Sequence, residues 1–244
     1  MNTLDSMLFL GGGGSKEQSA ELDMAFIDYI NKTRSDVTNV AYIPVGMAEK
    51  QAKYPYPSCL EWFKDTFQNR IDVIEMWTDL GSITLTNLQD KGAVYIGGGD
   101  TDVLLQQIRS CGFEILLKQF IQEGGAYYGG SAGAIILGKD IRTAEEVRNR
   151  TEPKLNSFQG LNILQGYSIF PHFKKSNEGF SGKTVAELVI KLDSPIIAIP
   201  EASGVIVTQK TLRIVGKDAV SIFSKEGRMD IEPNNDQTIE LPVL

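Results

Sequence analysis

A serine lies between small residues in the pentapeptide Gly129-Gly130-Ser131-Ala132-Gly133, directly after an apolar run. The pentapeptide matches G-x-S-x-G, the pattern of a nucleophile elbow, in which a strained strand-to-helix turn exposes the serine hydroxyl. A glycine-rich turn whose serine caps the next helix has the same pattern. The pentapeptide alone therefore leaves a nucleophile and a helix cap about equally open.

The residues that could activate this serine lie at the ends of other apolar runs. A serine hydroxyl needs a base near neutral pH, and the chain has one histidine, His172, directly after the run 167–170. Glu201 follows the run 196–199, with Pro200 limiting its backbone. The carboxyl ends of strands are where open α/β sheets bind ligands. We therefore expect His172 to be the base of Ser131, the alternative being another base such as a lysine. Glu201 can orient the imidazole or can be a solvated loop carboxylate.

Two further carboxylates could orient His172 instead of Glu201. Asp100 follows the glycine run 97–99, and Glu178 lies in a polar run shortly after the histidine. The backbone amides of such a glycine run can approach a reacting oxygen, as an oxyanion hole requires. The same run could also be a tight turn that Asp100 or Thr101 caps, and the two roles can coexist.

Short apolar runs that alternate with amphipathic stretches must position these residues. This alternation predicts βαβ units and a mostly parallel sheet, because buried parallel strands read as continuous apolar runs. We expect strands at 7–10, 40–43, 71–76, 93–96, 126–128, 167–170, 196–199, 205–208, 212–215 and 220–223. The expected helices are 16–31, 57–68, 102–109, 113–123, 134–137 and 183–192. The last strands have no helices between them, which predicts an antiparallel C-terminal edge.

No linker or repeat divides the sequence, so we expect one α/β domain over residues 1–244. If the strands before Gly97, Ser131, His172 and Glu201 are parallel neighbours, all four features meet along one sheet edge. The polar stretch 139–159 predicts a long surface excursion beside the site. The glycine run 11–14 fits no phosphate-binding motif and is interpreted as a close-packed turn that lines the site.

Net charge, the cysteine pattern and the search for targeting segments limit the binding partners and the cellular compartment that we expect. The formal net charge of -7, without a basic cluster, argues against nucleic acid. Cys59 and Cys111 form no C-x-x-C pair, so neither a zinc site nor another metal or cofactor is expected, and free thiols fit a reducing compartment. The sequence shows no signal peptide and no membrane span, which predicts a cytoplasmic protein, a monomer or homodimer, that acts without a membrane.

Taken together, the chemistry-bearing segments resemble peptidase family S51, from the first glycine run to about Val207. The matching pieces are Tyr95-Ile96-Gly97-Gly98-Gly99-Asp100-Thr101, Gly130-Ser131-Ala132-Gly133-Ala134, Pro171-His172-Phe173 and Ile199-Pro200-Glu201. The resemblance implies a flavodoxin-like sheet, similar to the class I glutamine amidotransferases. It also implies a serine peptidase of small peptides, with Ser131 as nucleophile, His172 as base and Glu201 as acid. Gly98, Gly99 and Ala132 fall where the family builds its oxyanion hole.

One departure from the family bears on the substrate. Dipeptidases of this family carry an arginine after the Pro-His-Phe segment that suits an aspartyl substrate, whereas this chain has Gly182-Lys183-Thr184-Val185. Lys183 can offer charge but not a planar fork. Lys183 and Asp100, which stands where asparagine is common in that branch, are therefore the substrate-binding candidates. The alternative is a non-catalytic protein of the same fold that holds a metabolite in its pocket.

Overall fold

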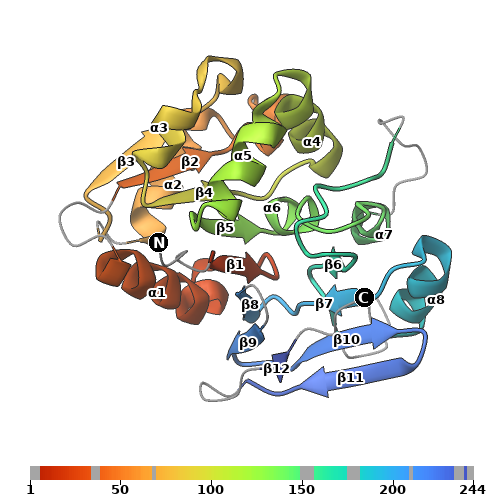
Figure 1. Ribbon diagram of the computed structural model, residues 1–244. Helices are drawn as coiled ribbons and strands as arrows, with labels where there is room; N and C mark the ends of the chain where they lie inside the picture. Colours follow the sequence, from red (N-terminus) through yellow and green to blue (C-terminus); the bar gives the residue numbers. More distant parts are fainter. Residues whose placement is uncertain are drawn as a thin grey trace.

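Two β-sheets form the frame of the molecule (Figure 1). The computed structural model describes residues 6–33, 39–67, 70–148, 157–174, 182–208, 211–233 and 239–240. The strands are β1 (Leu8–Gly11), β2 (Asn39–Ile43), β3 (Val73–Met76), β4 (Ala93–Ile96), β5 (Ala126–Gly130), β6 (Ser168–Phe170), β7 (Ile196–Ala198), β8 (Ser203–Val207), β9 (Thr211–Gly216), β10 (Val220–Ser224), β11 (Gly227–Ile231) and β12 (Ile239–Glu240). The helices are α1 (Lys16–Thr33), α2 (Tyr56–Thr66), α3 (Leu85–Gln89), α4 (Thr101–Ser110), α5 (Phe113–Gln122), α6 (Ala132–Ile135), α7 (Thr143–Arg148) and α8 (Gly182–Leu192), with 3₁₀ turns η1 (Val45–Lys50) and η2 (Leu80–Ser82).

The larger sheet has eight strands in the order β12-β9-β8-β1-β5-β4-β2-β3. Strands β1, β5, β4, β2 and β3 pair in parallel. Strands β8, β9 and β12 extend the sheet beyond β1 with antiparallel pairs. The predicted mostly parallel sheet and its antiparallel C-terminal edge are therefore confirmed.

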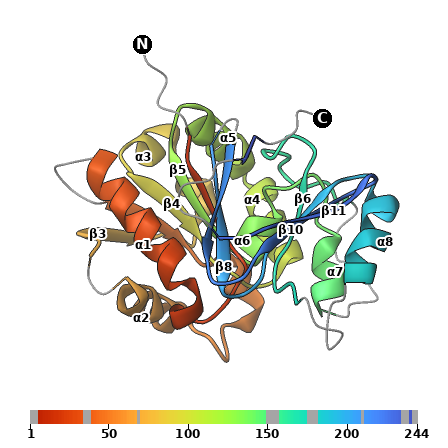
Figure 2. The same ribbon diagram turned by 90° about the horizontal axis from the view of Figure 1, so that it is seen from below.

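Helices cover both faces of this sheet (Figure 2), and its central strands β1, β4 and β5 are buried on both sides. Successive residues of a strand point to opposite faces. In β4, Val94 and Ile96 pack with residues of α3, α4 and α5. Tyr95, between them, packs with residues of α1 and α2 on the other face. This arrangement explains why the sequence shows continuous apolar runs rather than alternation.

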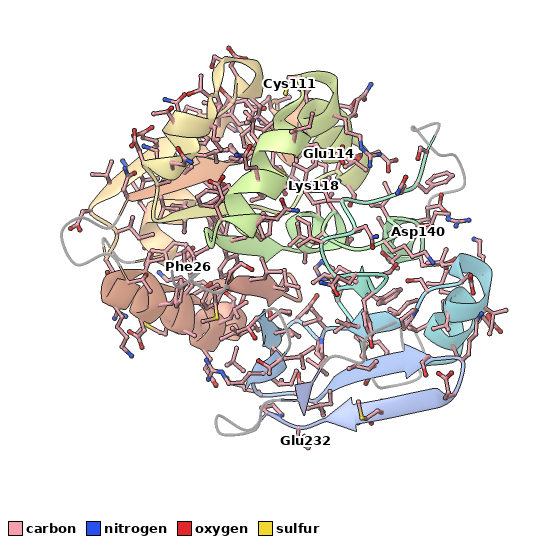
Figure 3. All side chains as sticks on the ribbon, in the orientation of Figure 1. Phe26, Cys111, Glu114, Lys118, Asp140 and Glu232 are labelled. Atoms are coloured by element: carbon pink, nitrogen blue, oxygen red, sulfur yellow. The ribbon has the colours of Figure 1, made fainter. Side chains whose placement is uncertain are left out.

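An aromatic layer fills the space between α1 and the sheet. Phe26, labelled in Figure 3, is fully buried and packs edge-on against both Phe9 and Tyr128. The Tyr128 hydroxyl donates a 2.6 Å hydrogen bond to Asp23 of α1. The second oxygen of Asp23 accepts from Ser19 at 2.7 Å. Burial in this largely apolar layer raises the pKa of Asp23. The two hydrogen-bond donors hold its carboxyl group in place.

The smaller sheet has four strands in the order β11-β10-β7-β6. Strands β6 and β7 pair in parallel, and α8 covers them with Val185, Leu188 and Val189. The condition that the strands before Gly97, Ser131, His172 and Glu201 are all neighbours in one sheet is therefore met only in part: β4 and β5 are parallel neighbours, and so are β6 and β7, but the two pairs lie in different sheets. Strand β8 occupies the position beside β1, while β6 pairs with β7 and β7 pairs with β10 in the smaller sheet.

The segment 139–159 is less of a surface excursion than its polar composition suggests. Ile141 and Ala144 belong to the main core. Asp140, labelled in Figure 3, is 8% exposed and accepts hydrogen bonds from the backbone and guanidinium of Arg142. Residues 149–156 of this stretch lie outside the described part of the chain. The isolated apolar residues thus bury the start of the segment, and Asp140 pairs with Arg142 there.

Candidate active site

Ser131 lies at the turn between β5 and α6 with a strained backbone. Its φ and ψ are 48° and -105°, and it makes no side-chain cap hydrogen bond to α6. Only glycine fits on either side of the turn: a Cβ at Gly129 would lie 2.7 Å from the Gly133 carbonyl carbon, and one at Gly133 would lie 2.2 Å from the Ile96 oxygen. Tyr127 fixes the turn further by donating to the Gly133 oxygen at 2.7 Å. The hydroxyl of Ser131 is therefore exposed by local geometry and is not used as a helix cap.

The Ser131 hydroxyl meets the side chain of His172, which in turn meets Glu201. Ser131 Oγ lies 3.0 Å from His172 Nε2, and His172 Nδ1 lies 3.0 Å from Glu201 Oε1. A carboxylate only accepts, so the imidazole donates from Nδ1 and leaves Nε2 to accept the serine proton. The side chains of His172 and Glu201 are 26% and 36% exposed, which leaves the site open to small molecules.

Backbone contacts at the ends of β6 and β7 hold the base and the acid. The chain turns at His172, whose φ of 56° is in the left-handed region. Ile199 N donates to Phe170 O at 2.8 Å, and Phe173 N donates to Ile199 O at 3.1 Å. These two hydrogen bonds join the loops that carry His172 and Glu201, so the two side chains keep their separation.

A glycine loop, residues 11–14, connects this pair to the nucleophile. Gly11 O accepts from Ser131 N at 3.2 Å, and Gly12 O accepts from His172 N at 2.9 Å. A Cβ at Gly13, whose φ is +88°, would lie 2.5 Å from His172 Cε1 and 3.0 Å from Ser131 Cβ. The glycine loop therefore packs directly under the reacting groups, where any side chain would displace the imidazole.

The electrostatics of Glu201 suit an orienting acid. The hydrogen bond with His172 lowers the pKa of Glu201, and burial opposes this shift. The carboxylate is thus ionised at neutral pH and can stabilise positive charge on the imidazole. No group of three or more His, Cys, Asp or Glu side chains within the described ranges could hold a metal ion. The chemistry that this arrangement can perform is nucleophilic attack by Ser131.

The residues predicted for an oxyanion hole lie around Ser131. A Cβ at Gly98 would lie 3.5 Å from Ser131 Cβ. Gly99, with a φ of +142°, packs against the backbone of Gly46. The Ala132 amide is the first of α6 and therefore has no acceptor within that helix. Gly98 thus lies beside Ser131, and the role of the Gly98, Gly99 and Ala132 amides as donors to an oxyanion stays a prediction.

The remaining candidates are placed differently. Asp100 is buried, and its Oδ1 accepts from the backbone amides of Asp102 and Val103 at the start of α4. Asp100 therefore caps a helix, as its sequence position allowed. Lys183 belongs to α8, but its side chain lies outside the described residues, as does all of Glu178.

Sequence reasoning missed one residue near the acid. Gln18 lies in the first turn of α1 and lines the same cavity as Glu201. A polar residue at a helix start is common, so nothing in the sequence alone singles out Gln18. Its proximity to Glu201 depends on the path of the glycine loop.

Comparison with known proteins agrees with this geometry. The solved structure of a peptidase from an acI-B1 actinobacterium has the same fold, with a TM-score of 0.72 and 17% identity over 99% of both chains. The fold is therefore that of the α/β proteins similar to class I glutamine amidotransferases. The family model of peptidase family S51 matches residues 7–215, so the chain belongs to peptidase family S51.

Curated relatives carry the name peptidase E. The Shewanella denitrificans protein is 28% identical over 156 residues, which cover 61% of this chain and 65% of that protein. The Haemophilus influenzae protein is 25% identical over 216 residues, which cover 84% of this chain and 85% of that protein. The chain thus matches somewhat less than two thirds of the length of the Shewanella relative.

Proposed function

We propose that this protein is a serine peptidase that hydrolyses dipeptides or other small peptide and amide substrates through an acyl-enzyme on Ser131. The observation that carries the proposal is the continuous chain of contacts from Ser131 Oγ to His172 and Glu201, each 3.0 Å long. Membership of family S51 and the peptidase E relatives support the same reaction. We place this activity in the cytoplasm, in line with the free thiols of Cys59 and Cys111.

The proposed reaction has two halves. His172 Nε2 takes the proton of Ser131 as its oxygen attacks the substrate carbonyl, while Glu201 stabilises the imidazolium that forms. The backbone amides of Gly98, Gly99 and Ala132 donate hydrogen bonds to the negatively charged oxygen that forms on the substrate carbonyl. The imidazolium then protonates the leaving amine, and the same histidine activates water to release the acyl group from Ser131.

A dipeptide library tests this function on purified wild type and Ser131→Ala. The substitution removes only a hydroxyl, so folding should be unchanged while hydrolysis falls on the order of ~10⁶-fold. A fluorophosphonate probe should label native wild type, but neither Ser131→Ala nor heat-denatured wild type. Activity of Ser131→Ala within tenfold of wild type would refute the nucleophile, and an unlabelled, inactive wild type would favour the metabolite-binding alternative.

The same library tests the choice of substrate. This chain has Lys183 where family dipeptidases carry an arginine, so a substrate aspartate lacks a planar bidentate partner. We propose that Asp at the first position is weakly preferred or not preferred, and that neutral residues are accepted. A strong preference for Asp-X dipeptides would show that another cation replaces the arginine.

A further inference from the structure

Three tyrosines form a row across the centre of the larger sheet. Tyr42 of β2, Tyr95 of β4 and Tyr128 of β5 are direct partners in the parallel register, and β4 lies between the other two strands (Figure 1). All three rings pack with residues of α1 and α2 on one face of the sheet. Tyr95 stacks on Tyr128 with ring centroids 4.5 Å apart, and Tyr42 stacks on Phe63 of α2 at 4.4 Å. This packing fixes where each hydroxyl lies.

The hydroxyls of the row differ in their partners. Tyr128 donates to Asp23 at 2.6 Å. Tyr42 and Tyr95 are only 3% and 4% exposed, yet their hydroxyls make no hydrogen bond to any residue in the described part of the chain. Neither oxygen is among the fully enclosed atoms that lack a partner, so each faces open space. A hydroxyl in so buried a place costs stability unless it is hydrogen-bonded, which points to a partner that is not part of the protein.

The space that these two hydroxyls face lies beside the nucleophile. A Cβ at Gly97 would lie 3.9 Å from the Tyr42 hydroxyl, and a Cβ at Gly130 would lie 3.8 Å from the Tyr95 hydroxyl. Gly97 follows β4 directly, and Gly130 directly precedes Ser131. Because both positions are glycine, no side chain covers the hydroxyls from this edge of the sheet. The two hydroxyls are therefore within reach of a substrate side chain held at Ser131.

The order of the strands decides which half of a substrate reaches the hydroxyls. Strand β5, which leads to Ser131, lies between β1 and β4. His172 approaches on the β1 side, where its backbone amide donates to Gly12 O. The leaving amine lies on that side too, because the imidazolium protonates it. Tyr42 and Tyr95 lie on the opposite, β4 side, which the side chain of the acyl half, the first residue of a dipeptide, would occupy.

The chemistry of the two hydroxyls favours a neutral polar group. Burial raises the pKa of both Tyr42 and Tyr95, so both keep their protons at neutral pH and can donate and accept hydrogen bonds. The Asp23 carboxylate, bonded to the next tyrosine of the row, places negative charge on the same face of the sheet. A substrate carboxylate would be repelled by this charge, whereas a neutral amide or hydroxyl would not.

We infer that the hydroxyls of Tyr42 and Tyr95 form a subsite for the first residue of the substrate, which selects a neutral hydrogen-bonding side chain such as the amide of Asn or Gln. This inference rests on the proposed function and names its substrate class. The two tyrosines contact the substrate away from the reacting bond, so they determine specificity and do not activate Ser131. A site built to hydrogen-bond a polar side chain rejects the apolar analogue.

The test compares Gln-Ala with Met-Ala, in which an apolar side chain of similar length replaces the amide, and with Glu-Ala. Wild type should cleave Gln-Ala with the highest kcat/KM of the three. Tyr42→Phe and Tyr95→Phe keep the stacked rings and remove one hydroxyl each. Each should lower kcat/KM for Gln-Ala about tenfold and change that for Met-Ala by less than about twofold. The double variant should no longer prefer Gln-Ala.

Tyr128→Phe is the matched control, because it removes a hydroxyl from the same row that is already bonded to Asp23. It should keep the preference for Gln-Ala but unfold at a lower urea concentration. Tyr42→Phe and Tyr95→Phe should unfold at the wild-type urea concentration or above it, because they remove hydroxyls without a partner. A double variant that keeps the wild-type preference, or that loses activity on Gln-Ala and Met-Ala equally, overturns the inference. An equal loss of preference in Tyr128→Phe also overturns it.

The rate at which a fluorophosphonate labels Ser131 separates this inference from the proposed function. Labelling requires an activated serine but no peptide side chain, so wild type, Tyr42→Phe and Tyr95→Phe should be labelled at the same rate. A wild type that is not labelled contradicts the proposed function itself. A labelled wild type that does not favour Gln-Ala contradicts the subsite alone.

Discussion

The two sheets contribute different parts of the site by different means. The eight-stranded sheet contributes Ser131 through a turn whose shape depends on its own neighbours, Gly129 and Gly133. The four-stranded sheet contributes His172 and Glu201 from two strands of three residues each. Their position depends on contacts with distant segments, above all the glycine loop. The nucleophile is thus set by local backbone strain, whereas the base and the acid are set by long-range packing.

Among the residues that the smaller sheet contributes to the site, Glu201 is the one whose substitution should have the largest effect on activity. Glu201→Gln can still hydrogen-bond His172 but cannot offset the imidazolium charge, so we expect kcat to fall ~10²–10⁴-fold. Thermal unfolding should change little. Asp100→Asn is the comparison, because an asparagine oxygen can still cap α4, and it should cost much less. A crippling Asp100→Asn with a nearly silent Glu201→Gln would make Asp100 the acid of the triad.

A second variant tests whether the glycine loop acts on the base rather than the nucleophile. The new methyl group of Gly13→Ala would lie 2.5 Å from His172 Cε1, so the imidazole must shift. Misplacement by about 1 Å can cost on the order of 10²-fold in rate, and we expect a loss of that size in kcat.

Gly112→Ala is the matched control for Gly13→Ala. Gly112 also has a left-handed φ, +77°, but a Cβ there meets nothing within 4 Å. Both variants should lose about 1–2 kcal/mol of stability from backbone strain, measured by urea unfolding. Only Gly13→Ala should lose activity; equal kcat values in the two variants would show that the glycine loop does not position His172.

The smallest expected effect comes from Asp23→Asn, in the aromatic layer that packs on the larger sheet. This substitution should change stability but not activity. Burial raises the pKa of Asp23, so its contribution to stability is greatest at low pH and is lost as the pH rises through the folded pKa. Asp23→Asn does not titrate and can keep the Tyr128 hydrogen bond. Each unit by which a pKa is raised corresponds to about 1.4 kcal/mol of unfolding free energy.

Urea unfolding at several pH values checks the Asp23 prediction. The unfolding free energy of Asp23→Asn should increase relative to wild type as the pH rises above the ordinary aspartate pKa of about 4. The kcat of Asp23→Asn should match wild type, because Asp23 lies in the aromatic layer and not at the triad. A relative stability that is constant or falls with pH would contradict the raised pKa.

Much of the fold can be predicted from the sequence because buried strands need apolar runs. Strand β4 is found at its predicted bounds, and most other strands lie within a residue or two of theirs. Strand β11 was not predicted, since four of its five residues are exposed and leave no apolar run. The pairing of β6 with β7 was not predictable either, because a short apolar run does not show which strand it will pair with.

The residues of the candidate site also differ in how well they can be predicted from the sequence. The tight turn at Ser131 can be predicted from five consecutive residues, because it needs small neighbours, but those residues alone do not separate a nucleophile from a helix cap. His172 and Glu201 could be proposed from their position after apolar runs, but their mutual distance depends on loop contacts that no local pattern encodes. Gln18 left no signal at all, because its place on the cavity beside Glu201 depends on a contact far away along the chain.

The glycine loop also determines when the site can form during synthesis. Gly12 donates to Ser203 O at 3.2 Å, so the glycine loop takes its final position only after Ser203 has been synthesised. A nascent chain that ends before Glu201 can form the turn around Ser131 but lacks the acid that orients His172. Hydrolytic competence is therefore acquired only after β7 and the residues that follow it have emerged, and shorter chains carry a serine without its complete triad.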